Sequence, residues 1–137
     1  MSVRIRIKTM PKDSKNIAKI VIVDEKQRVL FLKRSAYSKK YANEWDLPGG
    51  HVKEKENLIV GLKREVLEET SINIANASYF DKKGNTHFFY SVYNGENISL
   101  SDEHTDYIFF DKSYLKKSQK YQKIALRVLD LLEEQEK

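Results

Sequence analysis

Hydrophobic and polar positions along the chain predict several strands before residue 35. Residues 3–7 alternate apolar and basic side chains, which is typical of a half-exposed strand. Residues 17–23 are largely apolar and β-branched, so they predict a buried strand that follows a loop at residues 11–16. The polar stretch 24–28 predicts a turn, and residues 29–32 predict a second strand that completes a hairpin.

The middle of the chain contains a break in regular structure and then a helix. Residues 35–44 form a basic loop that contains tyrosine, and residues 45–50 read Trp-Asp-Leu-Pro-Gly-Gly. Proline and paired glycines interrupt regular structure and let the backbone approach a neighbouring group closely. Residues 57–70 contain no proline and predict a helix, with Asn57 as its N-cap or within its first turn.

The second half of the chain predicts short strands and a final helix. Strands are expected at residues 72–74, 77–80, 87–93 and 107–110, with a turn at Gly84-Asn85. Residues from about 118 to 134 predict a C-terminal helix that packs on a sheet. Its apolar face consists of Tyr121, Ile124, Ala125, Val128, Leu131 and Leu132. Because several strands separate the helices, the chain predicts an α/β sandwich, as a single domain over residues 1–137.

Composition excludes several classes of protein. Apolar residues make up 40% of the chain and charged residues 33%, which is typical of a folded domain. No apolar run approaches the roughly 20 residues that span a bilayer, and basic residues interrupt the N-terminal apolar positions, so neither a membrane span nor a signal peptide is expected. The absence of cysteine excludes a disulfide scaffold, a thiolate zinc site and a cysteine nucleophile. Together these features favour the cytoplasm.

The net charge of +5 favours anionic partners, including small polyphosphates. Basic residues occur as separate doublets, Lys39–Lys40, Lys82–Lys83 and Lys116–Lys117, which can serve solubility alone. The chain shows no helix-turn-helix or zinc-finger pattern, so nucleic acid is not an expected partner.

The helix expected in the middle of the chain changes character along one face. Residues three, four and seven apart share a helix face. Leu58 and Leu62 begin an apolar stripe, and Glu65 and Glu69 lie seven residues further along it. Glu68 stands beside them, three residues after Glu65. An apolar face therefore becomes acidic within one helix.

This acidic face favours a bound cation. Like charges at these spacings oppose a helix by roughly 0.2–0.5 kcal/mol per pair, and a partly buried carboxylate also loses hydration. Arg64 can pair with Glu68, but one arginine does not neutralise the whole group. Oxygen ligands of this kind suit hard cations, Mg²⁺ above all or Mn²⁺, and the alternative is a solvated acidic face.

Residues from Gly50 to Ile72 resemble the Nudix box, G-x5-E-x7-R-E-U-x-E-E-x-G-U, in which U is aliphatic. Eight of its nine specified positions match, at Gly50, Glu56, Arg64, Glu65, Val66, Glu68, Glu69 and Ile72. Ser71 stands where the family has its second glycine. That glycine follows the catalytic helix, where a left-handed conformation is common. Serine adopts this conformation at a cost of about 1 kcal/mol, unless the helix ends differently.

The resemblance implies a Nudix-type α/β/α sandwich with a mixed β-sheet. It also implies a Mg²⁺-dependent hydrolase that cleaves the diphosphate linkage of a nucleoside diphosphate derivative by attack of water on phosphorus. Glu65, Glu68 and Glu69 would hold the metal, with the Gly50 carbonyl as a further ligand. Glu56 would either bind another metal or brace the loop.

Other roles implied by the resemblance stay less defined. Arg64 would orient the glutamates, and the catalytic base would be Glu65 or Glu103, because Nudix enzymes often supply a base or a metal ligand from a late loop. A nucleoside triphosphate pyrophosphohydrolase and a non-catalytic module that binds nucleotide or RNA are the alternative functions. Many members of the family form dimers, which favours a homodimer.

Substrate-binding residues are expected outside the box. Tyr90 follows Ile72 at an offset that resembles dinucleoside polyphosphate hydrolases of the family, although strand packing is the alternative. Trp45 could stack on a base and Arg34 could meet a phosphate. His104 could contact phosphate or sugar, with an incidental surface position as the alternative.

Overall fold

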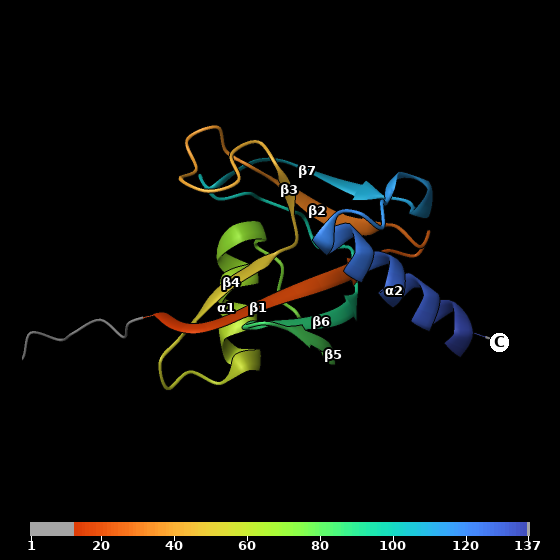
Figure 1. Ribbon diagram of the computed structural model, residues 1–137, viewed down its shortest axis with the longest axis horizontal. Helices are drawn as coiled ribbons and strands as arrows, with labels where there is room; N and C mark the ends of the chain where they lie inside the picture. Colours follow the sequence, from red (N-terminus) through yellow and green to blue (C-terminus); the bar gives the residue numbers. More distant parts are fainter. Residues whose placement is uncertain (1–12, 137) are drawn as a thin grey trace, which may run out of the picture.

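A computed structural model describes residues 13–136, which form one mixed seven-stranded sheet with a helix against each face (Figure 1). The elements in chain order are β1 (Asp13–Val23), β2 (Val29–Arg34), β3 (Trp45–Asp46), β4 (Gly49–Lys53), α1 (Leu58–Thr70), β5 (Ser78–Lys83), β6 (Thr86–Val92), β7 (His104–Phe110), the short 3₁₀ helix η1 (Lys112–Tyr114) and α2 (Lys120–Gln135). The prediction of an α/β sandwich with a mixed sheet is confirmed. Within residues 13–136, no helix is long and apolar enough to cross a membrane.

The central strand β1 organises the sheet. One edge of β1 pairs in parallel with β6, from Ile17 opposite Thr86 to Val23 opposite Val92. Its other edge pairs antiparallel with β4 and then, at Val23, with β2. Strand β2 also pairs with β3 and β7, and β5 pairs with β6. Because the same edge of β1 pairs first with β4 and then with β2, the strands β4 and β2 diverge and leave a gap in the sheet.

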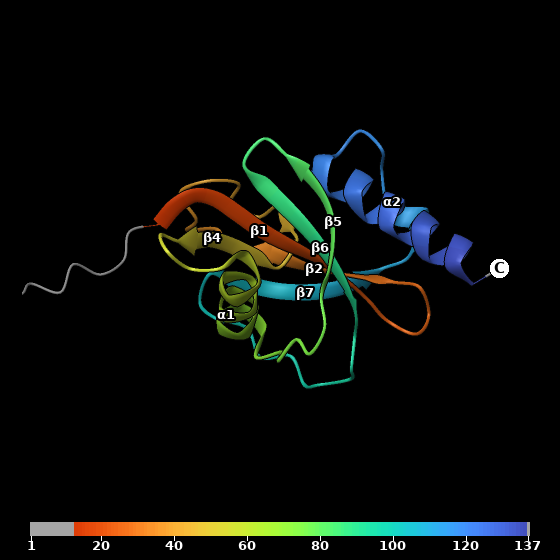
Figure 2. The same cartoon turned by 90° about the horizontal axis from the view of Figure 1, so that it is seen from below.

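Side chains of β1 alternate between two hydrophobic cores, as a strand requires. Ala18, Ile20 and Ile22 pack with Leu62 and Val66 of α1. Val21 and Val23 face the opposite way, into a core that includes Ile124, Ala125 and Val128 of α2. Figure 2 shows the two helices on opposite sides of β1. The sheet is therefore covered on both faces, which explains why residues 17–23 are so apolar.

Several expected elements differ from the structure. The loop expected at residues 11–16 is wrong from Asp13 onward, since β1 already pairs there with Lys53 of β4. The strand expected at residues 72–74 is absent. The backbone of Asn73 instead binds side chains: its N–H donates to Glu96 and its carbonyl accepts from Asn94. The strand expected at residues 3–7 lies outside the described residues.

Both helix predictions are confirmed, with small shifts at their ends. The carboxamide oxygen of Asn57 accepts from the Ile59 N–H at 2.9 Å, so Asn57 caps α1. Helix α2 begins at Lys120 rather than near residue 118. Its buried face also includes Leu126 and Leu129, whereas Leu131 and Leu132 are only half-buried. Beyond the sheet's edge the end of α2 has less to pack against.

Candidate active site

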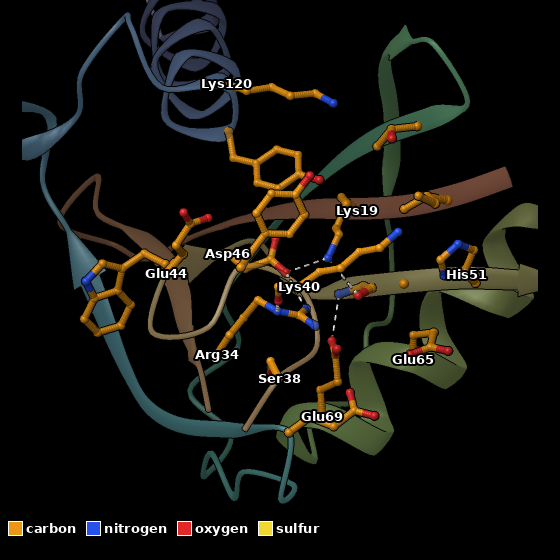
Figure 3. A pocket seen from close by; sticks show the side chains of 18 of the residues that line it. Lys19, Arg34, Ser38, Lys40, Glu44, Asp46, His51, Glu65, Glu69 and Lys120 are labelled. Atoms are coloured by element: carbon orange, nitrogen blue, oxygen red, sulfur yellow. Dashed lines mark hydrogen bonds and ion pairs between the residues drawn. The ribbon is translucent and has the colours of Figure 1, made fainter. Parts of the chain in front are cut away.

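A cavity of about 770 Å³ opens beside the parting of β4 from β2 (Figure 3). Carboxylates line one side of it: Glu65 and Glu69 project from α1, and Glu103 comes from the loop before β7. Basic side chains line other parts of it, namely Arg34 at the end of β2, Lys39 and Lys40 in the following loop, and Lys120 at the start of α2; the acids Glu44 and Asp46 line it as well. The cavity thus combines carboxylates of α1 with basic side chains from β2, the following loop and α2.

Glu69 is the most deeply buried of the acids, at 5% exposure. One of its carboxylate oxygens accepts the N–H of Gly49 at 2.8 Å. Burial raises the pKa of Glu69 to about 8, against the lowering effects of Lys19 and of this N–H. Burial also raises the pKa of Glu65, although Arg64 opposes that shift. Both carboxylates are therefore destabilised as anions until a cation joins them.

Glycines 49 and 50 let the backbone approach these acids closely. Gly49 has φ +122°, and a Cβ there would lie 2.1 Å from the Ala18 carbonyl oxygen. A Cβ on Gly50 would lie 2.8 Å from Oε2 of Glu65. The first glycine is required by the strand pairing of β4 with β1, and the second leaves room for the Glu65 carboxylate.

Lys19 is a residue of the site that the sequence analysis did not identify. Its ammonium group is buried and donates to Asp46 Oδ2 at 3.0 Å and to the carbonyls of Leu47 and Gly49, each at 3.1 Å. Burial works to lower the pKa of Lys19, but Asp46 and Glu69 outweigh it and the net pKa is raised. A lysine inside an otherwise apolar strand was the available signal, since a lysine is rarely buried without partners.

Arg64 holds three acids of the box together. Its guanidinium donates to both carboxylate oxygens of Glu56, at 2.9 and 3.0 Å, and to Glu65 at 3.0 Å. The contacts to Glu68 are longer, at 3.5 Å. Glu56 also accepts the Lys53 N–H at 3.0 Å, and the hydrogen bonds from Arg64 lower its pKa to about 2. The geometry favours Glu56 as the brace of the loop before α1.

Glu68 lies apart from the cavity lining. It is exposed and does not line the cavity wall, in contrast to its neighbour Glu69. The helical spacing explains this, because consecutive residues lie about 100° apart around the axis. The structure therefore brings Glu65, Glu69 and Gly50 together and leaves Glu68 at the rim.

Residues 93–103, the loop before β7, form hydrogen bonds with the C-terminal end of α1. The N–H groups of Ser99 and Ser101 donate to the carbonyls of Thr70 and Glu69, at 2.9 and 3.1 Å. These bonds satisfy helix carbonyls that have no partner within α1. They also deliver Glu103 to the cavity, close enough to Glu65 to raise that carboxyl's pKa further.

Ser71 ends α1 in the left-handed conformation, with φ 66° and ψ 12°. Its N–H donates to the Leu67 carbonyl at 2.9 Å. The expectation that Ser71 adopts the left-handed conformation is therefore confirmed, and the serine takes the place of the glycine of the Nudix box.

The residues expected to bind substrate are only partly brought together. Arg34 and Trp45 line the cavity, and Arg34 also donates to Asp46 Oδ2 at 3.2 Å. Tyr90 does not line it; its ring packs edge-on against Phe80, as the strand-packing alternative supposed. His104 is not at the surface but 5% exposed, and burial lowers its pKa to about 4.

Comparison with known proteins identifies the family. The NUDIX domain model matches residues 14–131, and the chain belongs to the Nudix family. Over 77 residues it is 40% identical to an 8-oxo-dGTP diphosphatase of Buchnera aphidicola subsp. Schizaphis graminum (strain Sg). That match covers 51% of this chain and 58% of the relative, so the chain aligns with little more than half of the relative's length.

Solved structures share the fold. The MutT protein from Methanosarcina mazei Go1 has a TM-score of 0.65 and 27% identity, over 91% of this chain and 97% of that one. A C. elegans Ap4A hydrolase has a TM-score of 0.66 and 19% identity, over 85% of this chain and 97% of that one. At 19% identity the likeness concerns the fold alone.

Proposed function

We propose that this protein is a Mg²⁺-dependent hydrolase that cleaves the diphosphate linkage of a nucleoside diphosphate derivative, by attack of water on phosphorus. One observation carries the proposal: Glu65 and Glu69 face the Gly49-Gly50 turn in a cavity that basic side chains also line. A cation beside Glu65 and Glu69 and an anionic substrate beside Lys39, Lys40 and Lys120 would each relieve a charge imbalance.

The residues fit a hard divalent cation. Carboxylate and carbonyl oxygens are the ligands that Mg²⁺ prefers, and it commonly shares its site with substrate phosphates. Glu69 offers a carboxylate with one oxygen fixed by the Gly49 N–H, and the bare Cα of Gly50 lies beside Glu65. Glu65, Glu69 and the Gly50 carbonyl would hold the ion, and Mn²⁺ suits the same ligands.

Each protein group has a separate role in the proposed reaction. A bound Mg²⁺ would supply charge neutralisation at the phosphates and activation of water. Glu65 or Glu103 accepts the proton of the attacking water, since both line the cavity. Arg64 fixes the Glu65 carboxylate, and Arg34 and Lys40 bind phosphate oxygens.

A nucleoside triphosphate is the second substrate class that an observation favours. The relative that is 40% identical is an 8-oxo-dGTP diphosphatase, and its match covers 77 residues. On this proposal the chain releases a nucleoside monophosphate and pyrophosphate. Trp45 lies in the cavity wall, where its ring would stack on the base.

A panel assay tests both proposals together. Nucleoside triphosphates including 8-oxo-dGTP, ADP-ribose, nucleotide sugars, dinucleoside polyphosphates and capped RNA would be incubated with Mg²⁺, and the products identified. Release of a nucleoside monophosphate from at least one compound is expected, and the preferred compound decides the substrate class. If nothing is cleaved with Mg²⁺ or Mn²⁺, the protein is a binding module instead.

Glu69→Gln tests the metal assignment within the same assay. The glutamine keeps an acceptor for the Gly49 N–H but removes the charge, so Mg²⁺-dependent hydrolysis should fall by at least about a hundredfold. Unchanged hydrolysis would contradict the assignment. We also propose that the protein is located in the cytoplasm and forms a homodimer, as expected from the sequence. Measurement of its size in solution tests the homodimer.

A further inference from the structure

Helix α2 carries a charged stripe on the face opposite to the one that packs on the sheet. Figures 1 and 2 show α2 at one side of the molecule, with its C-terminal end projecting beyond the strands. The side chains of the stripe are exposed and lie three or four residues apart, which places them on one face of the helix. In chain order they are Lys123, Arg127, Asp130 and Glu134. Two bases are therefore followed by two acids along an outer surface.

The order of these charges does not stabilise the helix that carries them. The N-terminal end of a helix favours acids, and the C-terminal end favours bases. Helix α2 has no acid in its first turn and no base in its last turn. Like charges also lie four residues apart, at Lys123 and Arg127 and again at Asp130 and Glu134. The stripe is therefore unfavourable within α2, and a partner with the reversed charge order would compensate it.

A second copy of the chain offers the reversed order. Two α2 helices that pack antiparallel about a two-fold axis present the basic half of each stripe to the acidic half of the other. Lys123 and Glu134 are equally far from the middle of the stripe, so they lie opposite each other across the axis. The same holds for Arg127 and Asp130. One register thus brings every charge of the stripe against an opposite charge.

We infer that the outer stripe of α2 is the surface through which two copies of this protein associate. The inference rests on the proposed function only for the homodimer, whose surface it specifies, since none of the four charged residues lines the cavity. Lys123 and Glu134 have no ion-pair partner among residues 13–136, so both are available to a second copy. Leu131 borders the stripe, is half-buried and belongs to neither hydrophobic core of the same residues. Its apolar surface adds to the contact.

The existing ion pairs of the stripe leave room for this partner. Arg127 Nη1 lies 2.7 Å from Asp81 Oδ2, and Lys112 Nζ lies 3.2 Å from Asp130 Oδ1. A guanidinium group has five N–H donors and a carboxylate accepts several hydrogen bonds, so both groups can bind a second partner. Ion pairs at a surface are weak and are screened by salt. The association should therefore be weak and strongly dependent on ionic strength.

Sedimentation velocity of the full chain, over a range of protein concentrations, tests the association. We expect a monomer–dimer equilibrium in about 0.02 M NaCl, with a dissociation constant at least about tenfold higher in about 0.5 M NaCl. A native protein that stays monomeric in low salt at every concentration would overturn the inference, and the proposed homodimer with it. A dimer whose dissociation constant does not depend on salt would overturn the inference alone.

Charge reversal tests whether the stripe is the surface involved. Lys123→Glu and Glu134→Lys each place like charges opposite one another twice per dimer, so each variant should dimerise at least about tenfold more weakly. An equimolar mixture of the two variants restores every opposite pair and should dimerise as the native protein does. Lys26→Glu is the matched control, because it makes the same change in net charge in the exposed turn between β1 and β2. It should leave dimerisation unaltered.

The double variant Lys123→Glu with Glu134→Lys guards against an effect of misfolding. It keeps the net charge and places its charges in the sense that the helix dipole favours, so it should fold and dimerise. Failure of both the mixture and the double variant to recover dimerisation would overturn the inference. Hydrolysis is a separate readout, and all these variants should retain it because both positions lie outside the cavity lining. A native protein that dimerises through the stripe but cleaves nothing would contradict the proposed hydrolase alone.

Discussion

Glu69 has a buried carboxyl group whose charge depends on pH and on whether a cation is bound. Its pKa is about 8 in the folded protein and near 4.5 as an ordinary glutamate. The folded state therefore binds more protons than the unfolded state between these values, and the stability of the metal-free protein should fall as pH rises through this window. A bound cation replaces the proton and removes the penalty.

Glu69→Gln should consequently stabilise the metal-free protein at pH 8, by up to a few kcal/mol. The same variant should lose the stabilisation that Mg²⁺ gives to the native chain. Thermal unfolding at pH 6 and pH 8, with EDTA or with Mg²⁺, measures both effects. A variant that is less stable than the native protein in EDTA at pH 8 would contradict the role of burial.

The paired glycines should differ in what their replacement does. Gly50→Ala places a Cβ against the flexible end of Glu65, so the fold should keep its stability within about 1 kcal/mol while Mg²⁺ binds roughly tenfold more weakly. Gly49→Ala is the matched control: its Cβ meets backbone, and its φ is strained for alanine, so unfolding is the main effect. Calorimetry and thermal unfolding of the two variants separate these outcomes.

At the scale of elements, α1 is the unit that carries the proposed metal ligands, and its end is strained. Ser71 holds a positive φ that glycine adopts without penalty. Ser71→Gly should therefore stabilise the protein by about 1 kcal/mol, less the weak bond from the serine hydroxyl to Ser99 at 3.3 Å. Denaturant unfolding gives the value, and Ser71→Ala, which keeps the strain and removes only that bond, is the control.

Elements with their own periodicity were predicted well from the sequence. The spacing of Leu62, Glu65 and Glu69 defined α1 and the face that carries its acids. The strand expected at residues 72–74 failed because apolar residues indicate burial, whereas a strand also needs a neighbouring backbone. Here side chains of Asn94 and Glu96 satisfy Asn73 instead. Such distant partners leave no local pattern in the sequence.

The candidate site likewise contains residues that the sequence predicts and residues that follow only from the fold. Glu65 and Glu69 lie on one helix at fixed spacing and were predictable, whereas the Lys19–Asp46 pair joins two strands and follows only from the fold. The burial of His104 depends on loop bonds to the end of α1, which sequence spacing does not contain. Tyr90 was ambiguous for a related reason: its offset suggested substrate contact, but the strand direction turns its ring toward Phe80.

For the whole molecule, the position of charge matters more than its sum. The sequence showed three lysine doublets as equivalent, but only Lys39–Lys40 lines the cavity. Lys39→Ala combined with Lys40→Ala should raise KM for an anionic nucleotide roughly threefold to tenfold, with a smaller change in kcat. Lys82→Ala with Lys83→Ala, on β5, makes the same change in net charge and should leave KM unaltered.

The dependence of KM on ionic strength is a second test of the role of Lys39 and Lys40. Added salt screens exposed charges, so it should raise KM of the native protein more than that of the Lys39–Lys40 variant. Equal salt dependence of both proteins would show that these lysines do not meet the substrate.

The hydrogen bonds between the loop before β7 and the end of α1 also imply an order of events in folding. Glu69 and Ser101 are about thirty residues apart, and joining the ends of such a segment costs about 3 kcal/mol in chain entropy beyond a constant. The β5–β6 hairpin lies within this segment and shortens the effective loop once it has formed. We expect the β5–β6 hairpin to form first and Glu103 to join Glu65 and Glu69 afterwards, so the hairpin would be present before the chain could hold a metal ion.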